Sequence, residues 1–139
     1  MAWPYVALTF IYCSTIVWLS GQSNPPMPAN FFPHWDKVEH IGAWGLLDAL
    51  VLLGMLRAKK SYSLRALLWF PPLFAIAFGI ADEFHQHFVP GRMVDPLDIV
   101  ADSTGAMLTQ GAFLLSVYRP GLRRFWPAEL PAPKAPREE

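Results

Sequence analysis

Apolar residues along the chain gather into four long runs separated by short polar connections. The runs cover Ala2–Leu19, Val38–Leu56, Ala66–Phe88 and Leu97–Tyr118. Each is close to the roughly 20 residues that an α-helix needs to cross about 30 Å of hydrocarbon. The pattern predicts an all-α integral membrane protein with four transmembrane helices, formed by residues 1–126. Residues 127–139, with four prolines and no apolar periodicity, are predicted to be a disordered tail.

The first run has a second interpretation, which is a cleaved signal peptide. It carries no Lys or Arg near its start. Its apolar stretch is also longer than the roughly 7–15 residues of a signal-peptide core. Both features favour a retained helix over a cleaved one.

Basic residues divide the connections between the runs into two kinds. Those in the second connection and after the fourth run are Arg57, Lys59, Lys60, Arg65, Arg119, Arg123 and Arg124. The other two connections contain only Lys37 and Arg92. The positive-inside rule therefore predicts that both termini, and with them the tail, are cytoplasmic and that the two acidic connections lie outside.

Composition supports a membrane protein and excludes one class of partner. Of 139 residues, 53% are hydrophobic and 16% are charged. Soluble domains are about 25% charged, so the chain is too apolar for a typical one. The net charge of +0 gives no basic surface for nucleic acid. Membrane lipids are the partners that this composition implies.

Ionisable residues are concentrated between the third and fourth runs. The segment 81–105 holds five carboxylates, two histidines, a glutamine and an arginine. Ionisable groups at membrane depth are costly, so they face a protein interior or a polar cavity and mark function. The segment therefore predicts a polar site at the outer end of the bundle.

A stripe of polar residues on the second helix points toward the same region. Asp36, His40, Trp44 and Asp48 are four residues apart, so they share one helical face. Asp48 lies about 15 Å below the start of the helix, near the membrane midplane. A carboxylate there must be protonated or hydrogen-bonded. Two interpretations stay open, a hydrogen bond to another helix and a proton or ion relay.

The end of the third run brings several ligand-type side chains onto neighbouring helical positions. Asp82 shares a face with His85 and Gln86, and Glu83 shares one with Gln86 and His87. His85 and His87 resemble a metal-binding pair, but two residues apart on a helix they point roughly 200° away from each other. One of these histidines at most is therefore expected in the site.

The connection to the fourth run contains a cationic residue and the predicted N-cap of the next helix. Arg92 follows a Pro-Gly turn and offers a planar fork to a carboxylate or phosphate. Asp95 reads as an N-cap, with Pro96 at the first helical position and Asp98 at the third. Capping and the helix dipole explain Asp95 and Asp98 as well as a functional role does.

Asp102 is the acid of the fourth run that capping does not explain. It lies one turn below Asp98 on the same face, which continues to Gly105 and Thr109. Small residues on such a stripe let another helix approach closely. Asp102 is therefore expected to face the bundle.

Three separated motifs carry a resemblance to a known family. DKVEH at 36–40, DEFHQHFVPGR at 82–92 and DPLDIVADSTG at 95–105 resemble the VanZ-like membrane proteins, over residues 36–110. The matching positions are Asp36, Lys37, His40, Asp82, Glu83, Gln86, Gly91, Arg92, Asp98, Asp102 and Gly105. Asp102 stands where many members carry Asn, and Thr109 where a second Gly is common.

The resemblance implies a role in the cell envelope more than it implies a reaction. The founding member is associated with resistance to a lipid-tailed glycopeptide antibiotic of the teicoplanin type. Family membership implies a multi-pass protein of the bacterial inner (cytoplasmic) membrane. A lipid-linked envelope molecule or a lipoglycopeptide is the implied ligand.

Two functional classes and one structural alternative follow from these residues. In the first, the cluster binds its ligand unchanged, with Arg92 and Lys37 holding an anionic group. The predicted binding residues are Asp36, Lys37, His40, Asp82, Glu83, Gln86, Arg92, Asp98 and Asp102. In the structural alternative, the same charged residues bind no large ligand and form a polar network that orients the bundle or handles small ions.

The second class is a hydrolase or transferase acting at the membrane surface. A hard divalent ion would be held by the oxygens of Asp82, Glu83, Asp98 and Asp102. The candidate catalytic residues are Glu83, Asp82, His40 and His85. The sequence requires no cofactor and leaves a divalent cation open as one.

Overall fold

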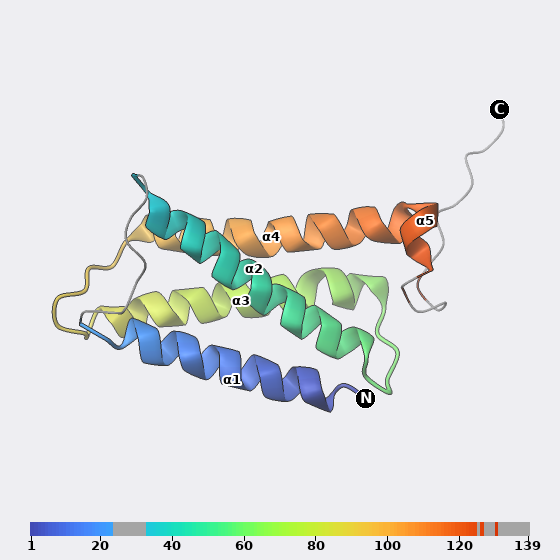
Figure 1. Ribbon diagram of the computed structural model, residues 1–139, viewed down its shortest axis with the longest axis horizontal. Coiled ribbons are helices and arrows are strands. Elements are labelled where there is room, and N and C mark those ends of the chain that lie inside the picture. Colours follow the sequence, from blue (N-terminus) through green and yellow to red (C-terminus); the bar gives the residue numbers. More distant parts are fainter. Residues whose placement is uncertain (24–32, 125, 127–129, 131–139) are drawn as a thin grey trace.

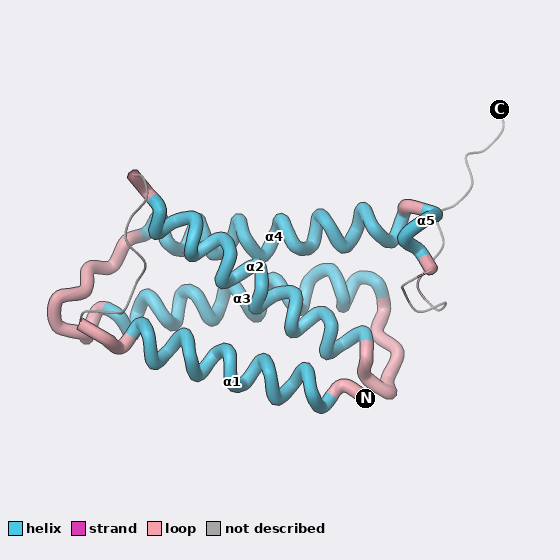
Figure 2. Tube along the Cα trace, viewed as in Figure 1, coloured by secondary structure: helices cyan, strands magenta, loops and turns pink. Residues whose placement is uncertain are grey.

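Four long helices account for most of the chain. The computed structural model describes residues 1–23, 33–124, 126 and 130, and the described residues form helices and no strand (Figure 2). The helices are α1 (Trp3–Ser20), α2 (Trp35–Leu56), α3 (Leu64–Gln86), α4 (Pro96–Tyr118) and the short α5 (Pro120–Arg123). The all-α prediction is confirmed. Of the predicted tail, only Leu130 is described, and its side chain is buried.

Consecutive long helices run in opposite directions and form one bundle (Figure 1). α1 and α3 finish at the end where α2 and α4 begin, and we call this the polar end. The N-terminus, α5 and the connection with Arg57, Lys59 and Lys60 lie at the opposite end, the basic end. α2 crosses the bundle obliquely and packs against α4, α3 and α1, and α4 also packs against α3.

Local capping sets the helix starts. The Ser63 hydroxyl accepts a hydrogen bond from the amide of Ala66 at 3.2 Å, so α3 begins at Leu64 rather than at the predicted Ala66. The Asp95 carboxylate accepts one from the amide of Leu97 at 2.9 Å, and Pro96 follows it. The predicted N-cap of α4 is thus confirmed.

The closest approach between helices occurs where α4 meets α2. A Cβ on Gly105 would lie 2.1 Å from the carbonyl oxygen of Ile41 and 2.9 Å from the amide nitrogen of Gly45. One turn further, the Thr109 hydroxyl donates to the Gly45 carbonyl at 3.0 Å. Thr109 thus adds an interhelical hydrogen bond to this close contact. The predicted small-residue contact is confirmed.

A buried polar pair joins the same two helices deeper in the bundle. Gln110 of α4 donates through Nε2 to both carboxylate oxygens of Asp48, at 3.1 and 2.9 Å. Asp48 is 0% exposed. The predicted hydrogen bond to another helix is therefore present, and it satisfies a carboxylate that lipid or water does not reach.

Three of the four long helices, α1, α2 and α3, are long and apolar enough to cross a membrane. α4 has the length but is less apolar on average. Its lower hydropathy comes partly from Asp98, Asp102 and Gln110, and all three are buried in the bundle. The large side chains on its outer surface are apolar and exposed: Leu97, Val100, Met107, Leu108 and Leu115. The membrane-protein prediction is confirmed through three helices, and the fourth span is taken up below.

Candidate functional site at the polar end

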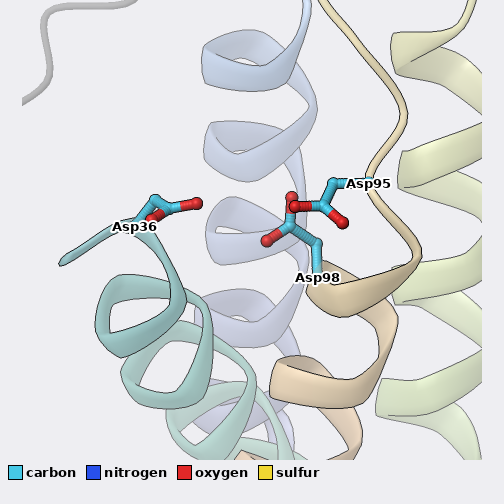
Figure 3. A group of neighbouring side chains, drawn as sticks. All are labelled: Asp36, Asp95 and Asp98. Carbon is cyan, nitrogen blue, oxygen red and sulfur yellow. The ribbon is translucent and has the colours of Figure 1, made fainter. Parts of the chain in front are cut away.

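Lys37 binds three carboxylates where α2 meets the start of α4. Its ammonium lies 2.9 Å from Asp36 Oδ2 and 2.6 Å from Asp98 Oδ1, and it also pairs with Asp95. Figure 3 shows the three acids converging from the start of α2 and from the start of α4. The bonded ammonium holds the pKa of the Asp95 carboxyl below its ordinary value. Lys37 therefore fastens α4 to α2 at the polar end.

The same three acids are the candidate metal ligands of the described residues. One oxygen from each of Asp36, Asp95 and Asp98 lies within 4.8 Å of the others. The Lys37 ammonium already contacts all three, so an internal cation occupies the centre of this group. Asp98 therefore lies next to Asp36 and Asp95. The described residues hold no such group made of Asp98 with Asp82, Glu83 and Asp102, the set expected from the sequence.

His40 is held in one orientation by two neighbours. Its Nδ1 lies 2.8 Å from Oδ1 of Asp102, a carboxylate that is 1% exposed. Its ring stacks on Trp44, with centroids 5.2 Å apart and planes 9° apart. The other ring nitrogen, Nε2, lies 3.7 Å from Asp98 Oδ1, beyond hydrogen-bonding distance. The predicted burial of Asp102 inside the bundle is confirmed.

A glycine on α3 leaves room for the Asp102 carboxylate. A Cβ on Gly79 would lie 2.5 Å from Asp102 Oδ2 and 2.7 Å from Trp44 Nε1. Both of these buried atoms have no hydrogen-bond partner among the described residues. Gly79 therefore permits the position of Asp102 that places its other oxygen on His40.

A second polar network joins α1 to α3. Asp82 accepts from the Ser20 hydroxyl at 2.6 Å and from Gln86 Nε2 at 3.0 Å. The same Gln86 nitrogen lies 3.5 Å from Glu83 Oε1, and Glu83 accepts the amide of Asp95 at 3.2 Å. Asp82, Glu83 and Gln86 are all buried. The predicted shared faces of Gln86 with both acids are confirmed, and the network makes a wall of hydrogen-bonded groups.

Arg92 has no anionic partner among the described residues at this end. It follows Gly91, whose φ of 82° a side chain would not readily adopt. Its Nε is buried and has no hydrogen-bond partner, and no ion pair of Arg92 is found within the described part of the chain. A buried guanidinium N–H without an acceptor is costly, so this side chain is suited to an incoming anion.

Two neighbouring cavities open around Arg92 and share part of their lining. The inner one has a volume of about 120 Å³ and lies against α1, α2 and α3, with Ser20, His40, Trp44, Asp82 and Arg92 in its wall. The outer one has about 620 Å³ and reaches the Lys37 cluster. Both cavities are lined by Glu39, His40, Gln86 and Arg92. The outer cavity alone has the size of ordinary ligand sites, about 300–1,000 Å³.

Three of the residues predicted from the sequence do not line these cavities: Glu83, His85 and Asp102. His85 is exposed, and its ring lies beside Gly21, where a Cβ would be 3.5 Å from His85 Nε2. It lines neither cavity, and neither does His87, which follows the last residue of α3. The cavities therefore bring together His40, Asp82 and Arg92 and leave His85 at the surface.

Sequence reasoning missed some of the residues that build this end. Ser20 and Trp44 were not among the predicted site residues, yet both line the inner cavity. The four-residue spacing from His40 to Trp44 was a usable signal, because it stacks the two rings on one helical face. Ser20 had no comparable signal in the sequence.

A comparison with protein families identifies the family to which this chain belongs. The family model described as VanZ/LLP1 matches residues 6–118. The chain belongs to the VanZ/LLP1 family. The match extends beyond the motifs at 36–110 and takes in most of α1 and all of α2, α3 and α4, so the VanZ/LLP1 relationship covers the whole bundle. No curated protein and no solved structure matches the chain.

Proposed function

We propose that this VanZ/LLP1 protein binds the phosphate or carboxylate of a lipid-linked envelope component or lipoglycopeptide at the polar end. The observation that carries the proposal is Arg92, a partly buried cation that lines a cavity and has no anionic partner among the described residues. Its planar fork can bind two oxygens of a phosphate or carboxylate at once.

The other basic side chains near the cavities are already engaged. Lys37 contacts three carboxylates, and His40 contacts the buried Asp102. From the sequence, Lys37 and Arg92 were both predicted to hold an anionic group of the ligand. The contacts favour different roles for the two residues. Lys37 joins α2 to α4, and Arg92 binds the ligand.

The proposed setting is the bacterial inner (cytoplasmic) membrane, crossed by four helices. The buried acids of α4 face the bundle and its outward side chains are apolar, which suits a lipid-facing helix. Arg57, Lys59, Lys60 and Arg65 lie at the basic end, so the positive-inside rule places that end in the cytoplasm. The polar end then faces outward, where envelope components and antibiotics arrive.

The test is ligand-induced stabilisation of the purified protein in neutral detergent. A polyprenyl phosphonate should raise the unfolding temperature of wild type, because a ligand that binds only the folded state stabilises it. The uncharged polyprenol should not. Arg92→Gln should weaken the apparent affinity about 10- to 100-fold, as expected from losing about 1.5–3 kcal/mol of charge-assisted hydrogen bonds.

Arg57→Gln is the matched control, because it removes the same charge at the exposed basic end. It should bind the phosphonate like wild type. Equal binding by wild type and Arg92→Gln would contradict the proposal, as would equal binding of phosphonate and polyprenol. A parallel titration with teicoplanin decides whether the lipoglycopeptide shares the site, since Arg92→Gln should weaken its binding as well.

A further inference from the structure

We propose that the same cavity hydrolyses phosphate monoesters of long-chain alcohols, with His40 as general base and Asp102 as the residue that positions it. The inference rests on the proposed function, because Arg92 must first hold the phosphate. It goes beyond binding by giving the site a reaction and a substrate class.

The contact between His40 and Asp102 fixes which ring nitrogen is basic. An ionised carboxylate can only accept hydrogen bonds, so His40 Nδ1, at 2.8 Å, must carry the proton. In the neutral ring the lone pair then lies on Nε2. Stacking on Trp44 keeps the ring from turning. A base oriented by a buried third group is the arrangement that activates nucleophiles in unrelated hydrolases.

The cavity places this base near the proposed phosphate site. His40 and Arg92 both line the inner and the outer cavity. The inner volume of about 120 Å³ exceeds the roughly 30 Å³ that one water occupies in the liquid. A water molecule and phosphoryl oxygens can therefore occupy it together. The network of Ser20, Asp82 and Gln86 forms another part of its wall.

The step follows from these positions. His40 Nε2 takes a proton from water while the water oxygen forms a bond to phosphorus. The bond between phosphorus and the alcohol oxygen breaks on the opposite face of the phosphorus atom. That oxygen takes a proton from solvent water, and the imidazolium returns its proton to solvent. Arg92 holds the non-bridging oxygens, on which the charge stays. The products are inorganic phosphate and the long-chain alcohol, and water is the only co-reactant.

The test measures phosphate released from polyprenyl phosphate in mixed micelles. Wild type should release phosphate, and His40→Gln, which removes the base, should lower kcat about 10²- to 10⁴-fold. Asp102→Asn no longer fixes the tautomer and should lower kcat strongly, while the phosphonate affinity stays within about threefold of wild type. His87→Gln removes an exposed histidine of the same end and should leave kcat unchanged.

A glycine pair tests the positioning of Asp102 without removing any reactive group. Gly79→Ala places a methyl group against Asp102 Oδ2 and Trp44 Nε1 and should lower kcat. Gly42→Ala meets nothing within 4 Å and should not. Thermal unfolding of each variant shows whether it is folded. A purely structural role for Asp102 predicts that stability falls while kcat of the folded fraction is kept.

The outcomes separate the two proposals. Phosphonate binding without phosphate release overturns the hydrolysis and leaves the proposed function intact. Release that persists in His40→Gln at the wild-type rate also overturns it. If the phosphonate does not bind wild type at all, the proposed function and this inference fall together.

Discussion

Gly105→Ala should destabilise the protein by about 3 kcal/mol or more, the largest effect expected of any single methyl group in this chain. The new Cβ would lie 2.1 Å from the carbonyl oxygen of Ile41, which is backbone and cannot rotate away. α4 would have to separate from α2, and the hydrogen bond from Thr109 to Gly45 would be lost with the contact. Unfolding in detergent, followed by circular dichroism, measures the loss.

Gly111→Ala is the control on the same helix. A Cβ at this position meets nothing within 4 Å, so no neighbour has to move. Alanine also favours a helix over glycine by about 1 kcal/mol, which predicts a variant equal to or more stable than wild type. If both variants unfold alike, the close α2–α4 contact is not what holds the bundle together.

Lys37→Met should have the second largest effect on stability, about 2–3 kcal/mol. Removing the ammonium leaves Asp98, whose side chain is 12% exposed, without its ion pair to Lys37. Breaking a fully buried pair costs about 3–5 kcal/mol, and the partial exposure of this cluster reduces that value. Lys59→Met, which removes an exposed lysine at the basic end, should change stability by less than about 0.5 kcal/mol.

The same variant tests what occupies the three-acid group. Wild type should gain no thermal stability from Ca²⁺ or Mg²⁺ through this group, because the ammonium contacts Asp36, Asp95 and Asp98. Lys37→Met leaves three carboxylates whose oxygens lie within 4.8 Å of one another, a set suited to Ca²⁺. Added Ca²⁺ should therefore restore part of its stability. Stabilisation of wild type that Lys37→Met abolishes would show that Lys37 assists a metal site instead.

The fold could be predicted from the sequence because membrane helices reveal themselves by length and apolarity. The four predicted runs correspond to α1 to α4. The boundaries were less accurate. α2 begins at Trp35 rather than Val38, because polar residues continue the helix beyond its apolar part. α3 ends at Gln86, two residues before the predicted Phe88. α4 shows why mean hydropathy alone can miss a helix of this kind. Its buried acids lower the mean, although the outer face of the helix is apolar.

The site could be predicted as a set of residues and less well as a set of contacts. Helical spacing placed Asp82, Glu83 and Gln86 together and turned Asp102 inward, as the structure has them. The distance between helices is not encoded in spacing along one helix. Lys37 and Arg92 therefore looked equivalent in the sequence, although only Lys37 reaches the acids of α4.

The metal quartet expected from the sequence illustrates the same limit. Asp98 and Asp102 share a helical face, but their partners differ. Asp98 meets Lys37 at the outer end, and Asp102 meets His40 one turn deeper. Lys37 and His40 of α2 thus bind different acids of α4. That division depends on how α2 crosses α4, which Gly45 and Gly105 determine.

An experimental structure of the protein with bound polyprenyl phosphonate tests the central claim most directly. We predict phosphonate oxygens about 2.7–2.9 Å from the Arg92 guanidinium, the distance of a charge-assisted hydrogen bond. His40 Nε2 should face the headgroup, and Lys37 should remain on its three carboxylates. A headgroup bound at the basic end, or Arg92 paired with an acid of the protein while the ligand is elsewhere, would contradict the account.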